Sequence, residues 1–497
     1  MPSQIGQHKL TSHGLVALAV VVSAVFVSYS NKRLWHSDLW AHLSYGRLIC
    51  EERSLPEFEP FMPLARDVPI RCTASLSQVV AFQTLSACGH HGLQLLHGLA
   101  AAIASCFVFL TAWRGSRSWF WSIVGTLAFL IVASSQLAII RPQLVGVACF
   151  PSVCLLARSD SFRLRHVVAC AVLFLLWGNM HPSFPAGLIV LAAFSAEAFA
   201  QWKLVRREDV GRFRYLTLAT FVAAVAVLAN PYGWRIYEEV FAVSANPNLR
   251  DLLDWRPLSL ARRQGQLAVI VGLVAATLVA RSRERRLADI VLVLLAGAAS
   301  VASARMLNWF APLVGIVIGA YGPGMFARDT IESDESRFDA RSIVVAAAIL
   351  ALALCLSPLL RVTGFRPSLT LEQTVSGTTP VEAVEFLNTR ANGMTFAPNT
   401  WGDYLVWTNG GDVDVLVTSH VHLVPRELWK DYLAISSGTD DAVELLDQYA
   451  VNTVLVNPRR AKLVDVLEES SEWLVVFDNK RSRVYQRTSA QRKGTAD

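Results

Sequence analysis

Charged side chains are scarce in this sequence. Asp, Glu, Lys and Arg make up 17% of its 497 residues, and hydrophobic residues make up 53%. A soluble protein of this size would have about 25% charged residues. Apolar runs long enough to cross a bilayer recur from the N-terminus to about residue 360. The composition therefore excludes an ordinary soluble domain and predicts a polytopic protein whose partner is the lipid bilayer.

The sequence also lacks the cysteine patterns that hold metals. It has eight cysteines, but no Cys-x-x-Cys and no Cys/His spacing typical of a zinc site. Most of the cysteines lie in or beside apolar runs, where cysteine behaves as a small hydrophobic residue. Cys50 and Cys72 lie in the first long loop, and a disulfide between them is compatible with a loop outside the cytoplasm.

Signals for cleavage, repeats and nucleic-acid binding are absent as well. No small-residue cleavage site precedes Asn31, so the first apolar run is predicted to be a retained helix. No internal repeat or low-complexity segment stands out. The net charge of +6 does not indicate a nucleic-acid partner, because Lys and Arg lie mostly in short loops between apolar runs.

The apolar runs predict about eleven membrane-spanning helices. The segment Ala74–Ala87 is only moderately apolar, and we expect it to form a helix in or near the membrane interface. The predicted spans are residues 14–30, 92–112, 119–135, 143–157, 167–180, 185–202, 215–229, 266–280, 287–304, 306–322 and 342–360.

The distribution of basic residues predicts the orientation. Cytoplasmic loops carry an excess of Lys and Arg. A cytoplasmic N-terminus would place the first loop, residues 31–91, and everything after residue 360 outside the cytoplasm. The short loops that are dense in Arg or Lys would then all be cytoplasmic; they are residues 114–117, 158–165, 203–214 and 281–286.

The composition changes after residue 360, where polar residues become common and apolar runs become short. Short strands alternate with helices from there to the end, which predicts a small α/β domain. The fold class is therefore an α-helical polytopic membrane protein, residues 1–360, with a C-terminal extracytoplasmic α/β domain, residues 361–497. That domain has no nucleophile elbow, phosphate loop or metal cluster, so we expect it to bind the acceptor or support the site. Its predicted strands are residues 412–418, 452–457, 473–478 and 483–486.

The stretch Trp35–Arg47 has an unusual composition for a connecting loop. It contains a carboxylate, two imidazoles and two indoles within eight positions, just after the first span. Residues Leu39–Leu48 are predicted to form a short helix, which puts Asp38 at its N-cap. Two interpretations remain open: Asp38 only caps this helix, or Asp38 and His42 belong to a catalytic site.

Other ionisable residues lie at the ends of predicted spans on the same side of the membrane. Arg141 opens the fourth span, His181 joins the fifth and sixth, and Arg305 opens the tenth. Such residues are costly unless they are paired or face water, so they are functional candidates. The alternative is that Arg141 and Arg305 extend to lipid headgroups and His181 only ends a helix. A transferase acting on a lipid phosphate would use a carboxylate as general base or cation ligand, and arginines to neutralise the phosphate.

The motifs resemble those of the bacterial GT-C superfamily of polytopic glycosyltransferases, in a branch related to polyprenyl-phosphate-sugar-dependent arabinosyl- and mannosyltransferases. Asp38–Gly46 resembles the Asp-x-Trp-x-His-x-x-x-Gly element of that branch. Leu55–Phe61 is similar to its Pro-x-x-Asp-Pro-Phe element, with Glu59 in the Asp position. Arg141–Leu144, Asn230–Gly233 and Asn399–Leu405 match further recurring elements.

The chain also departs from the branch in two places. A Trp-x-x-x-Glu-Trp element before the second span is replaced by Ile70–Ser75, and an Asp-Gly-Arg element by Thr418-Ser419-His420. Because the first element carries a carboxylate, Glu59 is our candidate for that second role.

The resemblance implies a glycosyltransferase of the bacterial inner membrane that moves a sugar from a polyprenyl-phosphate donor to an extracytoplasmic lipid, glycan or protein. It implies Asp38, Glu59 and His42 as catalytic residues, with Asp38 and Glu59 holding a divalent cation if one is used. Arg141, His181 and Arg305 would bind the lipid-phosphate-linked sugar. A transporter or a non-catalytic envelope assembly protein is the alternative, but the chain lacks the paired halves and mid-membrane charges of transporters.

Overall fold

The apolar runs fold as helices in a computed structural model, which describes residues 10–35, 38–205, 210–326, 339–390 and 393–488. His36 and Ser37 of the stretch after the first span lie outside the described residues. Within the described part, five helices are long and apolar enough to cross a bilayer, and five shorter apolar helices have 10–17 residues. Each predicted span coincides with a helix of the structure. The expectation of a membrane protein is confirmed.

The chain divides into two compact units, and each takes residues from several parts of the sequence. The first unit comprises residues 1–32, 88–236 and 253–368, and the second comprises 33–87, 237–252 and 369–497. The first loop therefore lies in the same unit as the C-terminal residues.

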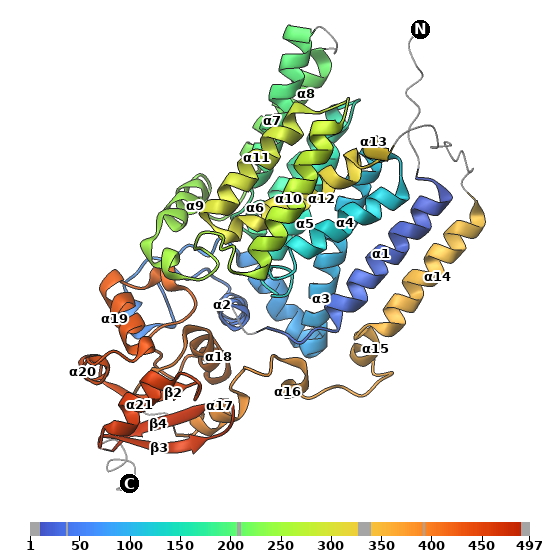
Figure 1. Cartoon of the computed structure of the whole chain (residues 1–497). Coiled ribbons are helices and arrows are strands. Elements are labelled where there is room, and N and C mark those ends of the chain that lie inside the picture. The colour runs from blue at the N-terminus through green and yellow to red at the C-terminus, as the bar shows by residue number, and fades with distance from the viewer. Residues whose placement is uncertain (1–9, 36–37, 206–209, 327–338, 391–392, 489–497) are drawn as a thin grey trace, which may run out of the picture. The chain divides into compact units, whose positions relative to one another are not determined.

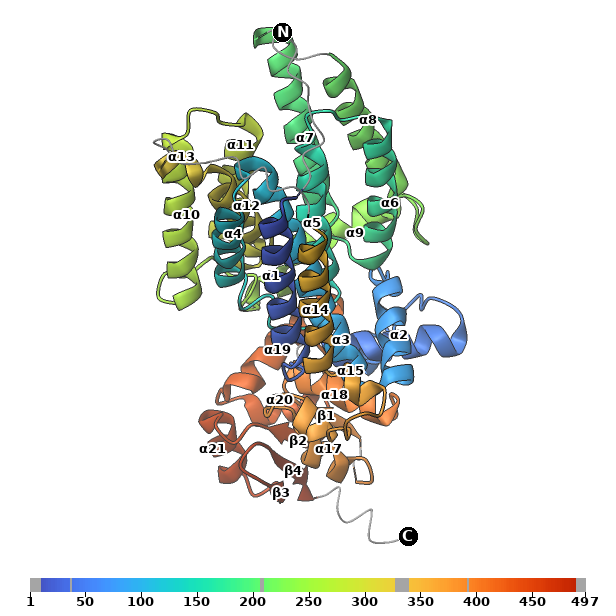
Figure 2. The same ribbon diagram turned by 90° about the vertical axis from the view of Figure 1, so that its right-hand side faces the viewer.

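The first unit is a helical bundle built around α12. Every residue of α12 except Ala320 is buried, whereas the neighbouring α4, α10 and α11 leave apolar side chains exposed. Close packing requires small residues: a Cβ on Gly125 of α4 would lie 2.3 Å from the carbonyl oxygen of Gly315 in α12. Helices α1 and α14 lie side by side (Figure 1 and Figure 2). The helices are α1 (Ser12–Ser30), the later part of α3 (Ser75–Ser116), α4 (Trp119–Val132), α5 (Gln143–Ala157), α6 (Leu164–Met180), α7 (Pro185–Ala200), α8 (Val210–Ala226), α10 (Arg263–Arg281), α11 (Leu287–Ala302), α12 (Leu307–Tyr321), α13 (Pro323–Phe326), α14 (Ala340–Leu356) and α15 (Leu359–Val362).

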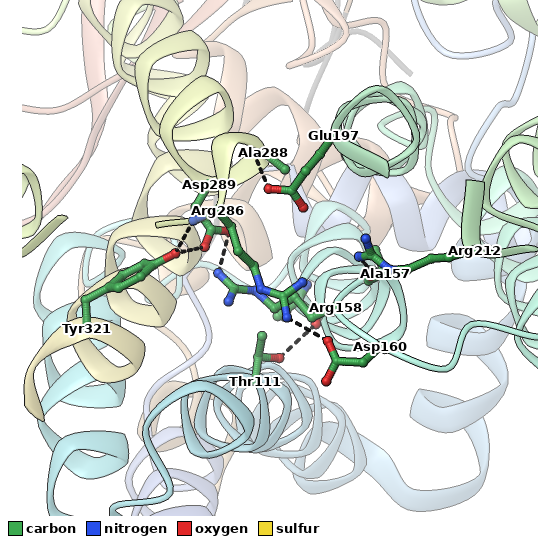
Figure 3. Close-up of polar contacts among 11 residues, drawn as sticks. Thr111, Ala157, Arg158, Asp160, Glu197, Arg212, Arg286, Ala288, Asp289 and Tyr321 are labelled. Atoms are coloured by element: carbon green, nitrogen blue, oxygen red, sulfur yellow. Dashed lines mark hydrogen bonds and ion pairs between the residues drawn. The ribbon is translucent and has the colours of Figure 1, made fainter. Parts of the chain in front are cut away.

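A buried ionic cluster ties helices of this bundle together at the end that carries the basic loops (Figure 3). Arg158 at the end of α5 donates to Asp289 in the first turn of α11 over 2.5 Å, and both side chains are at most 5% exposed. Tyr321 of α12 donates to the other oxygen of Asp289, and Glu197 of α7 accepts from the backbone amide of Ala288. Glu197 thus satisfies one backbone amide at the N-terminus of α11, and the Asp289 side chain bonds to Arg158 and Tyr321, so the cluster fixes α11 against α5, α7 and α12.

Helix α3 changes direction at Gly89, whose φ of 61° lies in the left-handed region that favours glycine. The helical turns before this kink, from Ser75, belong to the second unit. They correspond to the segment Ala74–Ala87, which we expected to form its own helix. A left-handed residue at the kink lets two helical segments follow one another without a loop.

The second unit combines the first loop with a four-stranded mixed sheet. The strand order is β1-β2-β4-β3, with β1 and β2 parallel and the other neighbours antiparallel. Residues 412–418 were expected to form a strand, but only Val415 pairs with Thr395, so this strand prediction is wrong. The elements are α2 (Leu39–Glu52), the first part of α3, most of α9 (Arg235–Ala245), α16 (Leu371–Thr374), α17 (Val381–Leu387), β1 (Met394–Phe396), α18 (Asn399–Asn409), α19 (Arg426–Ser437), α20 (Ala442–Gln448), β2 (Val451–Val456), α21 (Ala461–Glu469), β3 (Trp473–Asp478) and β4 (Arg483–Arg487).

The first loop packs directly on C-terminal elements within this unit. Leu34 forms a parallel bridge with Val375. Trp40 of α2 lies with its ring centroid 5.0 Å from that of Tyr404 in α18. Trp40 and Tyr404 are both buried. The helix that carries Asp38 and His42 is thus held by residues more than 300 positions further along the sequence.

Candidate functional site

Asp38 stands at the N-cap position of α2, but its side chain makes no capping hydrogen bond. Its φ of 59° lies in the left-handed region, which a non-glycine residue adopts at a cost in free energy. The backbone carbonyl of Asp38 accepts from the amide of His42 over 3.1 Å, so the helix begins there all the same. The interpretation of Asp38 as a side-chain cap is therefore wrong for this structure.

The glycine of the Asp38–Gly46 element lets α2 approach the first part of α3. A Cβ on Gly46 would lie 2.2 Å from the backbone oxygen of Gln78, so any other residue would push the helices apart. This contact brings the amide of Gln78 within 3.1 Å of Nδ1 of His42. The spacing of four residues between His42 and Gly46 thus puts the imidazole on the face that meets Gln78.

Glu59 is buried at 1% exposure, and both of its oxygens accept hydrogen bonds. Tyr45 of α2 donates its hydroxyl to Oε2, and the amide of Phe61 donates to Oε1 over 2.9 Å. Burial raises the pKa of Glu59, while these hydrogen bonds lower it in part. Glu59 therefore links the second half of the first loop to α2, and its predicted catalytic role remains a prediction.

The C-terminal elements add two residues that the sequence did not single out, Asp403 and His420. Asp403 is fully buried, and its Oδ1 accepts from the amide of Ser419 over 2.8 Å. Burial raises the pKa of Asp403, and the charges of Asp38 and Glu59 raise it further. Asp403 falls in the Asn399–Leu405 element, but nothing in the pattern indicates that its side chain faces the first loop.

His420 lies against the same face of α2. Its ring centroid is 4.8 Å from that of Tyr45 and 5.5 Å from that of His42, edge-on in both cases. Asp38, His42, Tyr45, Glu59, Asp403 and His420 thus form one group, which we call the acid cluster. All six lie in the second unit.

A divalent cation does not fit the acid cluster as it stands. Among the residues that the structure describes, no group of three or more His, Cys, Asp or Glu side chains is arranged to hold a metal ion. Both oxygens of Glu59 accept protein hydrogen bonds. Cys50 and Cys72 do not form a disulfide. We therefore derive no step that uses a metal.

In the first unit, Arg141 and Arg305 share one carboxylate. Asp254 Oδ2 lies 2.9 Å from a guanidinium nitrogen of Arg305 and 3.6 Å from one of Arg141. The Arg141 side chain is only 8% exposed, and the Arg305 guanidinium lies 5.1 Å from the ring centroid of Trp255. These contacts hold both arginines at the protein, so they do not simply extend to headgroups. Two arginines and one carboxylate leave a net charge of about +1, which suits a single anion.

His181 lies at the turn between α6 and α7. Its Nδ1 is 2.8 Å from the hydroxyl of Ser183, which also accepts from the indole of Trp177 over 3.0 Å. A Cβ on Gly146 would lie 2.4 Å from the Ser183 hydroxyl, so this turn packs against the start of α5. The ring of His181 is thus fixed through Nδ1, and its predicted contact with a phosphate stays a prediction.

Comparison of the sequence with protein-family models and with curated proteins gives no match. The structure, in contrast, is similar to solved glycosyltransferases. Archaeal oligosaccharyltransferase AglB from Archaeoglobus fulgidus, in complex with an inhibitory peptide and a dolichol-phosphate, matches with a TM-score of 0.55 and 10% identity over 89% of this chain and 69% of that one.

Two further structures extend this likeness. Arabinofuranosyltransferase AftD from Mycobacteria matches with a TM-score of 0.52 and 15% identity over 97% of this chain, which corresponds to 40% of AftD. ArnT from Cupriavidus metallidurans in the apo state matches with a TM-score of 0.50 and 14% identity, over 95% of this chain and 96% of ArnT. At these identities the likeness concerns the fold alone. The prediction from the motifs is confirmed at this level: the chain has the GT-C glycosyltransferase fold.

Proposed function

We propose that this protein is a membrane glycosyltransferase that moves a sugar from a polyprenyl-phosphate donor to a hydroxyl group of an extracytoplasmic lipid, glycan or protein. The observation that carries the proposal is Asp38, which has a strained backbone conformation, makes no side-chain cap, and lies close enough to the buried Asp403 and His420 for its charge to act on both. Strain of this kind clusters at functional sites. The GT-C fold supports the same conclusion.

In the proposed step, Asp38 accepts the proton of the acceptor hydroxyl as the hydroxyl oxygen attacks the anomeric carbon of the sugar. The bond from that carbon to the phosphate oxygen breaks, and its electron pair stays on the phosphate. The leaving polyprenyl phosphate gains one negative charge in this step. Arg141 and Arg305 of the first unit carry positive charge of the kind that suits such a phosphate.

The charge at Arg141 and Arg305 favours a donor with a single phosphate. A sugar linked through one phosphate is a phosphodiester with one negative charge, and the two arginines with Asp254 carry a net charge of about +1. A pyrophosphate-linked donor would bring about two negative charges. Asp254 thus makes the arginine pair a match for the singly charged donor.

The proposed setting is the bacterial inner membrane, with the N-terminus in the cytoplasm and the acid cluster outside. The orientation follows from the basic loops at residues 114–117, 158–165 and 281–286.

The proposal is tested with the purified full chain in liposomes. Polyprenyl-phosphate donors with a labelled sugar are added with hydroxyl-bearing lipid or glycan acceptors, and the products are separated. We expect the label on the acceptor and free polyprenyl phosphate in equal amounts. Labelled donor that crosses the bilayer with its sugar–phosphate bond intact would instead indicate a transporter, and an unchanged donor with every acceptor would contradict the proposal.

A further inference from the structure

The segment Val417–His420 is held in place from several sides. The backbone oxygen of Val417 packs on Gly402, where a Cβ would lie 2.6 Å away. The amide of Thr418 lies 3.4 Å from the sulfur of Met62, and the amide of Ser419 donates to Asp403 over 2.8 Å. The position of His420 is thus set by both the C-terminal elements and the first loop.

From this position the His420 ring touches two residues of α2 that connect it to its surroundings. One is Tyr45, which donates to Glu59, and the other is His42, which contacts Gln78. The two residues are three positions apart and lie on one face of the helix. His420 therefore contacts the part of α2 that follows Asp38 by one to two turns.

A histidine at this position lowers the stability of the folded state if its only role is to fill space. The Nδ1 atom of His420 is buried, and it has no hydrogen-bond partner among the described residues. A buried polar atom without a partner costs free energy. A phenylalanine would pack against the same rings without that cost, so the nitrogen itself calls for an explanation.

The groups around His420 keep its ring neutral. Burial lowers the pKa of His420 to about 3, and the nearby His42 lowers it too, while Asp38 acts in the opposite direction. Tyr45, which also faces the ring, carries no positive charge as a phenol, and the ring centroid of His422 lies 5.7 Å away. A neutral imidazole can donate one hydrogen bond to a carboxylate without giving up its proton.

We propose that His420 is a positioning residue for Asp38: with an acceptor bound, its Nδ1–H donates a hydrogen bond to the Asp38 carboxylate and directs the other carboxylate oxygen at the acceptor hydroxyl. This inference rests on the proposed function. The proton of the hydroxyl still goes to Asp38, and His420 neither gains nor loses one. The C-terminal half of the chain would thereby contribute to the chemical step, beyond acceptor binding.

The test compares two replacements of His420 in the full chain. His420→Asn keeps a donor nitrogen near the position of Nδ1, whereas His420→Phe keeps the packing and removes the nitrogen. We expect His420→Phe to lower kcat by about 10²-fold through misplacement of the carboxylate, with KM for donor and acceptor nearly unchanged. His420→Asn should retain most of the activity. His422→Phe, a change of the same kind two residues further along, is the matched control and should be close to wild type.

A second measurement makes the inference independent of the assay for sugar transfer. Thermal unfolding of wild type, Asp38→Asn, His420→Phe and the double variant, each measured with the hydroxyl-bearing lipid and glycan acceptors of the transfer assay present, forms a double-mutant cycle. Shifts in Tm that do not add would support a coupling between the two residues. If the wild type transfers sugar but His420→Phe is as active and its Tm shift adds to that of Asp38→Asn, the inference is wrong. If no protein transfers sugar, the proposed function fails, and the cycle alone decides whether His420 acts on Asp38.

Discussion

Asp254→Asn should turn the arginine pair of the first unit into a stronger anion site at the expense of stability. The amide keeps the shape of the carboxylate and can still accept a hydrogen bond from Arg305, but it removes the negative charge between two guanidinium groups. Arg141 is 8% exposed, Arg305 21% and Asp254 35%. Breaking a buried ion pair costs about 3–5 kcal/mol and an exposed one about 0–1, so we expect a loss of about 1–3 kcal/mol for this half-buried group.

An added anion should restore this loss. The net charge of the two arginines rises from about +1 to about +2 in the variant, so inorganic phosphate should bind more tightly than in the wild type. Phosphate at about 100 times its Kd stabilises by about 2.7 kcal/mol. Tm measured with increasing phosphate at constant ionic strength should therefore rise more in Asp254→Asn than in the wild type. In the transfer assay, the variant should show stronger inhibition by the product polyprenyl phosphate.

Asp251→Asn is a matched control for this experiment. Asp251 has a similar exposure, 31%, and pairs with Arg426 in the second unit. It should lower Tm without any added response to phosphate. If phosphate raises Tm equally in both variants and in the wild type, Arg141 and Arg305 are not an anion site, and the role of Asp254 in choosing a singly charged donor is refuted.

Three further substitutions test the packing and the charges that hold the two units. Gly46→Ala should lower Tm and activity together because its Cβ meets the backbone of Gln78 at 2.2 Å, whereas Gly324→Ala, with open space around it, should change neither. Glu59→Gln should gain stability relative to the wild type as pH rises from about 4 to 7. Burial raises the pKa of Glu59 in the folded state, so the wild type loses stability as pH rises above the ordinary glutamate pKa of 4.5, whereas the Gln variant does not. A difference in Tm between the two proteins that stays constant with pH would contradict this. Asp289→Asn should cost about 3–5 kcal/mol because it leaves Arg158 buried without a counter-charge, and a loss below about 1 kcal/mol in thermal unfolding would mean that the ionic cluster does not fix α11.

Much of the helical bundle was predictable because a single physical signal carries it. Long apolar runs cannot satisfy their backbone in a membrane except as helices, so the predicted spans and the observed helices coincide. The short helix after Asp38 was predictable for a similar reason, from the spacing of Leu39, His42 and Gly46. The strand expected at residues 412–418 was not formed, because β-propensity alone does not specify a pairing partner.

The polar partners were not predictable, because they come from distant parts of the sequence. Asp254 pairs with both Arg305 and Arg141, although in the sequence it lies 51 residues before Arg305 and more than 100 residues after Arg141. His420 reaches His42 across an even longer separation. Hydrophobic periodicity reports which face of a helix is buried, but it does not report which polar groups meet there. The left-handed conformation of Asp38 was likewise not predicted from the sequence.

The most direct test of the central claim is the turnover of Asp38→Asn. Asn keeps the shape of the side chain and tolerates a positive φ as Asp does, and the Asp38 side chain makes no capping hydrogen bond that could be lost, so expression and Tm should match those of the wild type. Loss of the carboxylate charge removes the proton acceptor, and we expect the rate of sugar transfer in liposomes to fall by about 10²-fold or more. An Asp38→Asn protein that transfers sugar at the wild-type rate would contradict the account and show that Asp38 is not the general base.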